Sequence, residues 1–138
     1  MKHFVLAAFA CAAGLGFQPA AAEIVYDCEM KPNTNDGGVP PRVLVLLDKD
    51  RQGAKVYDAF IHEAAGEPIE ARISPRKAHA FDLSWTVDAV PVRNRVSTTI
   101  GHFAAVFNES KRTLSVRATF SGFANFSRAR GKCKVKTD

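Results

Sequence analysis

The feature that most constrains the fold of this chain is a strict alternation of apolar and polar side chains in residues 79–88, HAFDLSWTVD. The residues between the apolar positions are polar, so the period is two, which is the period of a half-buried β-strand. We expect this segment to be the central core strand of a sheet. Its core-facing residues are Phe81, Leu83, Trp85 and Val87, which include the single tryptophan of the chain.

Similar patterns recur along the rest of the chain. Strands are expected at residues 23–30, 42–48, 68–74, 113–121 and 131–136, and the continuous apolar run of 42–48 is typical of a strand covered on both faces. Segment 54–63 is ambiguous, because a short helix over residues 58–65 fits it as well as a strand does. In segment 94–107 the apolar phase slips at Gly101, which indicates a β-bulge.

The connections between these segments decide the fold class. They are short, and no alternation of strand and helix is present, so a parallel nucleotide-binding sheet is disfavoured. Sequential antiparallel pairing is the default for strands joined in this way. The expected fold is all-β, a single-domain antiparallel meander of about eight strands. It closes into a barrel, with a β-sandwich as the alternative.

Residues 1–22 have the composition of a secretory signal peptide. Lys2 precedes an apolar stretch, Pro19 ends that stretch, and three alanines precede the expected cleavage point after Ala22. A membrane anchor is the alternative, but the apolar stretch is shorter than the ~20 residues that span a bilayer. We expect export to the periplasm of a Gram-negative bacterium, or secretion, and a mature β-barrel domain of residues 23–138 with no transmembrane segment.

Cleavage leaves two of the three cysteines, because Cys11 lies in the leader. An even number of cysteines in an oxidising compartment favours a disulfide, here Cys28–Cys133, over two free thiols. Two cysteines so far apart in sequence do not resemble the local ligand pairs of a zinc site.

A direct pairing of the two cysteines also fixes a register. If Cys28 lies opposite Cys133 in antiparallel strands, the neighbouring residues form favourable cross-strand pairs, one aromatic with β-branched and two of opposite charge. A slip by one residue would mix the two faces. The register joins the first strand to the last and closes the barrel; its pairs are Tyr26 with Val135, Asp27 with Lys134, and Glu29 with Lys132.

Several of these features together resemble one group of exported proteins. They are Cys28 on the first strand, the turn at residues 48–53, Trp85, and the ending at residues 131–133. In these features the mature chain resembles small periplasmic β-barrel proteins of alphaproteobacteria. The resemblance implies a calycin-like barrel and no particular activity.

Two groups of residues have the composition of a metal or catalytic site without its spacing. Asp48-x-Asp50-x-x-Gly53 resembles the start of a calcium-binding loop, but Ala59 stands where a bidentate glutamate is required, so we expect a β-turn. No nucleophile motif and no Gly-rich phosphate loop is present. We assign no catalytic residue, metal ligand or cofactor. The histidines that follow the leader are scattered and match no metal-binding spacing; they are His62, His79 and His102.

A series of five cations occupies every second position near the C-terminus, which places them on one face of an extended strand. The register above pairs two of them with acids, so the remaining three are the candidate anion-binding residues: Arg128, Arg130 and Lys136. The alternative is a solvated strand face whose charges discourage pairing with another edge.

The net charge of the chain and its expected export limit the classes of function that we consider. The chain has a formal net charge of +5, which becomes +4 when Lys2 leaves with the leader. The leading hypothesis is a non-enzymatic exported binding or interaction protein, whose ligand, such as a small apolar molecule, occupies the barrel interior or its rim. The alternative is a polyanion-binding or inhibitor protein that presents the basic face to an anionic envelope component. Export argues against intracellular nucleic acid, and an enzyme with an unrecognised site is the third class.

Overall fold

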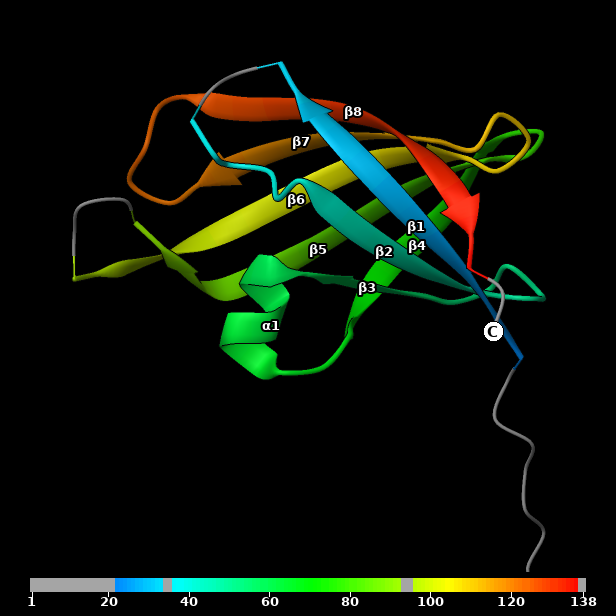
Figure 1. Cartoon of the computed structure of the whole chain (residues 1–138), viewed down its shortest axis with the longest axis horizontal. Coiled ribbons are helices and arrows are strands. Elements are labelled where there is room, and N and C mark those ends of the chain that lie inside the picture. The colour runs from blue at the N-terminus through cyan, green and yellow to red at the C-terminus, as the bar shows by residue number, and fades with distance from the viewer. Residues whose placement is uncertain (1–21, 34–35, 93–95, 137–138) are drawn as a thin grey trace, which may run out of the picture.

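The alternating segments form eight antiparallel strands in the computed structural model, which describes residues 22–33, 36–92 and 96–136. Each strand pairs with the next along the chain and β8 pairs with β1, so the sheet is a closed barrel (Figure 1). The predicted closed meander is confirmed, and residues 1–21 of the predicted leader lie outside the described ranges. The elements are β1 (Glu23–Pro32), β2 (Arg42–Asp48), β3 (Ala54–Asp58), α1 (Ala59–Ala65), β4 (Ile69–Lys77), β5 (Ala80–Pro91), β6 (Thr98–Asn108), β7 (Thr113–Phe120) and β8 (Phe126–Val135).

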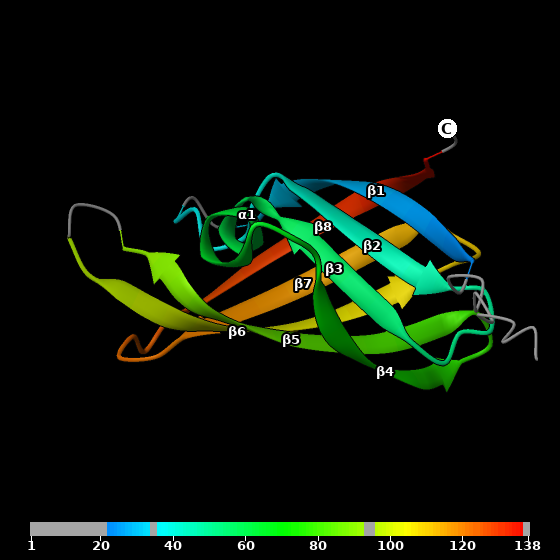
Figure 2. The same ribbon diagram turned by 90° about the horizontal axis from the view of Figure 1, so that it is seen from below.

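The connections gather at two ends of the barrel (Figures 1 and 2). One end holds α1, Val92 and the β7–β8 connection at residues 121–125, and we call it the α1 end. The other holds the start of β1, the end of β8 and the β2–β3, β4–β5 and β6–β7 turns, and we call it the termini end. The described connections therefore fall into two clusters, one at each end of the barrel.

The first and last strands meet in the predicted register. Cys28 lies opposite Cys133, and a disulfide joins them with an S–S distance of 2.03 Å. All three neighbouring pairs are also as predicted. Gly131 on β8 allows this close approach, because a Cβ at that position would lie 2.2 Å from the carbonyl oxygen of Glu29. The disulfide prediction is confirmed.

The predicted charge pairing across this seam takes a different form. Asp27 lies opposite Lys134, but its carboxylate accepts hydrogen bonds from the Arg42 guanidinium on β2, at 2.8 and 2.5 Å. Arg42 thereby holds the pKa of Asp27 below its ordinary value. Within the described residues neither Lys132 nor Lys134 forms an ion pair, so the acids of β1 do not neutralise them as the sequence indicated.

The ambiguous segment after β2 contains both a strand and a helix. β3 ends at Asp58, whose Oδ1 accepts a hydrogen bond from the Ile61 backbone N–H at 2.9 Å and so caps α1. Gly66 ends the helix in the left-handed conformation, with φ of 73°, where glycine has no steric penalty. Ile61 is fully buried, so this helix turns an apolar face into the end of the barrel.

The bulge predicted at Gly101 belongs to the neighbouring strand. Val87 pairs with Gly101 and Val90 pairs with Thr99, so the extra residue is on β5, while β6 keeps an unbroken alternation. The apparent phase slip arose because Ile100 is an apolar residue on the outer face, 41% exposed. Gly101 itself faces inward, where a Cβ would lie 2.8 Å from the Phe103 ring.

Of the strand predictions, those for β8 and β2 differ most from the structure. β8 begins at Phe126 rather than at residue 131. The apolar run of β2 is covered on its inner face only, because Leu44 and Leu46 point outward and are half-buried beside Val25 and Tyr57. The described residues place no second layer over them.

Candidate functional site

Side chains fill the middle of the barrel. Trp85 stacks on Phe103 with ring centroids 5.5 Å apart, and the ring of Phe107 meets that of Tyr26 at 4.8 Å. Leu83, Trp85 and Val87 of the predicted core strand are buried, and Phe81 is partly buried. Because the interior is occupied by these rings and by the aliphatic side chains of every strand, the rim and the outer surface are the candidate binding sites.

A pocket of about 580 Å³ opens at the α1 end, and we call it the mouth pocket. Aromatic and aliphatic side chains dominate its walls, and polar residues contribute one side. The lining residues come from α1, the ends of β5, β6 and β7, the β7–β8 connection, the start of β8 and the segment before β2. They are Asp36, Gly37, Gly38, Phe60, Val90, Pro91, Val92, Thr99, Phe120, Phe123, Asn125 and Ser127.

The aromatic stack of the core forms the floor of the mouth pocket. Phe60 and Phe120 line the pocket and also contact Phe103, with ring centroids 6.3 and 6.0 Å away. Phe103 in turn stacks on Trp85. The pocket is therefore closed toward the barrel interior, and a ligand would enter from the solvent side only.

Local structure explains why these wall residues face the pocket. The β5 bulge between Val87 and Val90 restores an inward direction to Val90, which is 3% exposed. The capped start of α1 places Phe60 over the barrel end. In Figures 1 and 2 the last part of β5 and the first part of β6 reach beyond α1. One wall of the pocket comes from this region, namely Val90, Pro91, Val92 and Thr99.

Apolar side chains left in contact with water concentrate at this end. Four large hydrophobic residues of the described chain are exposed, and they lie in the β5–β6 and β7–β8 connections or at the first residues of the strands that follow. They are Val96, Ile100, Phe123 and Phe126, exposed by 107%, 41%, 46% and 41% respectively. Such clustering marks a binding surface more often than scattered single residues do.

The polar side of the mouth pocket is an anchored carboxylate. Asp36 accepts hydrogen bonds from the Ser127 hydroxyl at 2.7 Å and from the Gly38 backbone N–H at 3.0 Å. Gly38 leaves room for this contact, since a Cβ there would lie 2.1 Å from the Ser127 hydroxyl oxygen. Among the residues that the structure describes, the pocket walls contain no lysine, arginine or histidine. The walls therefore suit an uncharged ligand better than an anion.

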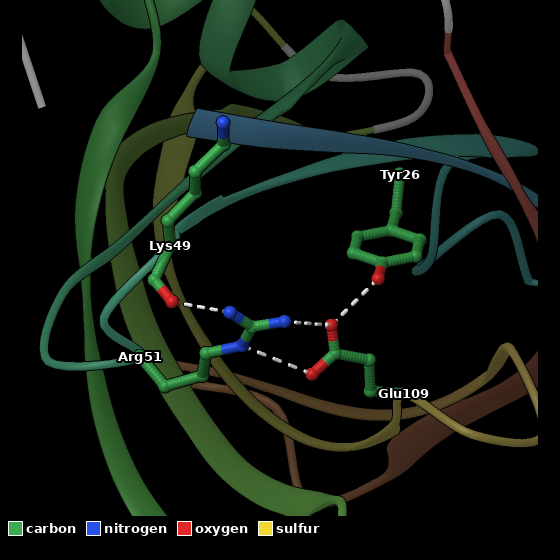
Figure 3. Close-up of polar contacts among 4 residues, drawn as sticks. All are labelled: Tyr26, Lys49, Arg51 and Glu109. Atoms are coloured by element: carbon green, nitrogen blue, oxygen red, sulfur yellow. Dashed lines mark hydrogen bonds and ion pairs between the residues drawn. The ribbon is translucent and has the colours of Figure 1, made fainter. Parts of the chain in front are cut away.

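Polar side chains close the opposite, termini end (Figure 3). The Tyr26 hydroxyl donates a hydrogen bond to Glu109 at 2.7 Å, and the Arg51 guanidinium donates two to the same carboxylate, at 3.1 and 2.9 Å. Arg51 also donates to the carbonyl oxygen of Lys49. This cluster ties β1 to the β2–β3 and β6–β7 turns, and we interpret it as a structural closure.

We expect the Tyr26 phenol to ionise only at strongly alkaline pH. Burial, together with the hydrogen bond to Glu109, raises the pKa of Tyr26 from 10.0 to about 12. The folded state thus holds this proton more tightly than the unfolded chain, so the stabilisation is complete below pH 10 and is lost as the pH rises toward 12. Melting temperatures across this interval check the prediction. Between pH 10 and pH 12 the melting temperature of the Tyr26→Phe variant should fall less than that of the parent protein. An equal fall in the two proteins would contradict the prediction.

The same cluster predicts a loss of stability in acid. Hydrogen bonds from Arg51 hold the pKa of Glu109 below its ordinary value. A lowered pKa contributes stability above the unfolded value, and this contribution is lost as the pH falls through the folded value. Glu109→Gln should therefore flatten the acid limb of the stability profile measured by urea unfolding. A variant with an unchanged acid limb would show that the ion pair contributes little.

The structure separates the three candidate anion-binding residues. Arg128 and Arg130 lie on the outer face of β8 near the α1 end, whereas Lys136 follows β8 at the termini end, where its backbone N–H donates to Val25. Arg117 on β7 lies directly opposite Arg128, and the sequence analysis did not single it out. The β7–β8 register would have revealed it, but the start of β8 was placed five residues too late.

The histidines and the calcium-like segment do not form a site in the described residues. Residues 48–53 make the β2–β3 turn, in which Asp50 accepts a hydrogen bond from the Gln52 backbone N–H at 2.9 Å. The described chain holds no cluster of three or more metal-ligating side chains. The three histidines lie on α1 beside Tyr57, in the β4–β5 turn and on the outer face of β6: His62, His79 and His102.

Comparisons with protein-family models, with curated proteins and with solved structures find no match to this chain. Within the described ranges, no helix has the length and apolar character needed to cross a membrane. The candidate function must therefore be argued from the geometry of the chain.

Proposed function

We propose that this protein is an exported, non-enzymatic binding protein, and that its ligand is a small uncharged hydrophobic molecule held in the mouth pocket. The observation that carries the proposal is the contrast between the two parts of the barrel. The interior is filled, but Phe123 and the walls around it leave an apolar space of about 580 Å³ open to water. Such pockets, with a few polar groups on one side, are typical of small-molecule sites.

The charges of the pocket support an uncharged ligand. Its described walls carry the Asp36 carboxylate and no cationic side chain, so an anionic head group would find no partner among these residues. The rings of Phe60, Phe120 and Phe123 provide flat apolar surfaces, which favour aromatic or cyclic ligands through edge and face contacts.

The expected leader and the disulfide support a location outside the cytoplasm. A disulfide is stable in oxidising compartments such as the periplasm, and Cys28–Cys133 ties the two end strands of the barrel together. We place the mature domain in the periplasm of a Gram-negative bacterium, where it would bind its ligand without chemical change.

Two fluorescent probes with the same aromatic skeleton test the ligand class. N-phenylnaphthylamine is uncharged, whereas anilinonaphthalene sulfonate adds a negative charge. We expect the oxidised mature protein to bind the neutral probe in the mouth pocket more tightly than the sulfonate, by at least about tenfold, because the described walls offer the sulfonate no cationic partner. Displacement of the bound neutral probe by an equal or lower concentration of the sulfonate would contradict the proposal.

A matched pair of variants tests the location. Phe123→Ala removes a pocket wall, and Phe126→Ala removes a similarly exposed ring that does not line the pocket. We expect Phe123→Ala to lower the affinity for the neutral probe by about fivefold, since one aromatic contact is lost. Phe126→Ala should leave it unchanged. Equal effects of the two variants, or binding that depends on dimerisation of the protein, would place the ligand elsewhere.

A further inference from the structure

A row of outward side chains crosses five adjacent strands of the barrel. Arg128 on β8 lies opposite Arg117 on β7, and Arg117 lies opposite Ala104 on β6. Ala104 lies opposite Ser84 on β5, which in turn faces Arg72 on β4. Arginines therefore stand at both sides of a stretch that carries only small side chains.

The small side chains leave the outer face hollowed. A groove of about 1230 Å³ runs over β4 to β8, and we call it the arginine groove. The neighbouring row also has small or medium side chains in its middle, namely Ser115, Val106 and Asp82, and it ends at Arg130 on β8. Backbone between these residues forms much of the floor.

Positive charge dominates the walls of the arginine groove. Its lining includes Arg72, Arg76, Arg117, Arg128 and Arg130, against the carboxylates of Glu70 and Asp82. Asp82 already pairs with Arg76 at 3.0 Å. The other arginines form no ion pair with any carboxylate of the described residues. The groove thus presents four guanidinium groups that are not neutralised by the protein.

Two of these arginines lie directly opposite each other on neighbouring strands, so that like charges are close together. Like charges directly opposite each other in a sheet are destabilising, yet Arg117 and Arg128 occupy such a position. Both guanidinium groups lie over the ring of Phe126, at 4.3 and 4.7 Å from its centroid. Cation–π contact holds the two groups together on the surface. An anion that bridges them would relieve the repulsion.

We propose that the arginine groove is a second binding site, for a linear anionic polysaccharide that crosses the strands from β8 to β4. Three strand spacings separate Arg117 from Arg72, which corresponds to ~14 Å along the sheet. That span exceeds a single small anion but fits successive charged groups of a polymer. The planar guanidinium fork suits carboxylate, sulfate and phosphate groups alike.

The lining of the groove favours a polysaccharide over a nucleic acid. Single strands of nucleic acid are held by stacking of bases on exposed aromatic rings. The outward side chains of the arginine groove include no aromatic ring, and Phe126 beside it is covered by two guanidinium groups. Ser84, Ser115 and Ser74 instead offer hydroxyl groups that can hydrogen-bond to sugar hydroxyls.

The test uses a labelled heparin oligosaccharide as the probe and fluorescence anisotropy as the readout. We expect affinity to fall steeply with salt, with a slope of about −3 in a plot of log K against log salt, because about four guanidinium groups release counterions. Inorganic sulfate at the same total charge should compete poorly. A sulfate ion that competes as well as the polymer would show that the site takes single anions, and would overturn the proposal.

Matched charge variants locate the site. The double variant Arg117→Gln, Arg128→Gln should weaken binding by at least about tenfold, and Arg72→Gln, on the far wall, by about threefold. The control Lys134→Gln, Lys136→Gln removes the same charge at the termini end of the same face and should change affinity less than about twofold. Equal losses in the two double variants would mean that only net charge matters, which contradicts a defined groove.

Two further measurements, the melting temperature of the double variant and a comparison with DNA binding, separate specific binding from unfolding and from general anion binding. The Arg117→Gln, Arg128→Gln variant should melt within a few degrees of the parent, since the loss of two cation–π contacts with Phe126 offsets the removal of a like-charge pair. Loss of binding therefore cannot be attributed to unfolding. Duplex DNA of equal charge should bind more weakly than heparin, and tighter DNA binding would overturn the polysaccharide assignment. The arginine groove and the mouth pocket share no lining residue. Phe123→Ala should therefore leave heparin binding unchanged.

Discussion

Removal of the Cys28–Cys133 disulfide should lower the free energy of unfolding by about 4 to 5 kcal/mol, the largest effect we expect from any change in this chain. The bond joins residues separated by 105 positions, and a crosslink that closes so long a loop removes much of the conformational entropy of the unfolded state. For a domain of this size the loss corresponds to a fall of about 15 °C or more in the melting temperature. The double variant Cys28→Ala, Cys133→Ala and thermal unfolding provide the measurement.

Reduction of the parent protein serves as the control for the double variant. Both should unfold at similarly reduced temperatures, because both lose the same crosslink. The β1–β8 register is also held by backbone pairing from Tyr26 to Pro32, so the reduced barrel should still fold at moderate temperature. A reduced protein that melts within a few degrees of the oxidised one would contradict the role assigned to the bond.

Truncation of Trp85 to alanine should cost about 3 to 5 kcal/mol of stability. Trp85 is 5% exposed and stacks on Phe103, which itself supports the floor of the mouth pocket through Phe60 and Phe120. Its removal leaves a large cavity in a closed barrel whose strands cannot readily move inward. Urea unfolding measures the loss, and the neutral probe should bind more weakly because the floor loosens.

An exposed aromatic residue provides the matched comparison. Phe126→Ala removes a ring that is 41% exposed, so its cost should be far smaller than that of Trp85→Ala. The fluorescence of the single tryptophan adds a direct check on the parent protein. Emission characteristic of an indole in water, in the folded state, would show that Trp85 is not part of the core.

The sequence predicts the closure of the barrel because the cysteine pairing and the neighbouring side chains indicate the same register between β1 and β8. The cysteines define the register, and the side chains beside them, Tyr26 with Val135 and Asp27 with Lys134, agree with it. The central strand is equally clear, since Leu83, Trp85 and Val87 alternate with polar residues. These signals are local patterns of burial, which a single sequence carries.

The start of β8 is not visible in the sequence for a physical reason. Its inward positions near the α1 end are Ser127, Ala129 and Gly131, which are small or polar, so no apolar alternation appears. Gly131 is small because the Glu29 backbone lies against it, and Ser127 is polar because it bonds to Asp36. Both requirements come from contacts with distant parts of the chain.

The mouth pocket and the arginine groove are also products of closure. Strands β4 to β7 lie between Phe60 and Phe123 in the sequence, and the barrel brings the two residues to one opening. Arg72 and Arg117 face the same groove because the intervening strands pair in one particular register. A periodicity analysis assigns each of these residues to an outer face or a turn, but it cannot say which of them meet.

The most direct test of the ligand site is a map of NMR chemical-shift changes in the oxidised mature protein on addition of N-phenylnaphthylamine. We expect the changes to be confined to the mouth pocket, with the largest at Val90, Val92, Thr99 and Phe123, and no comparable change at Leu114 and Val116 in the middle of the barrel. Shifts centred on Leu114 and Val116 would contradict the account, since they would place the ligand among the buried core side chains rather than at the rim.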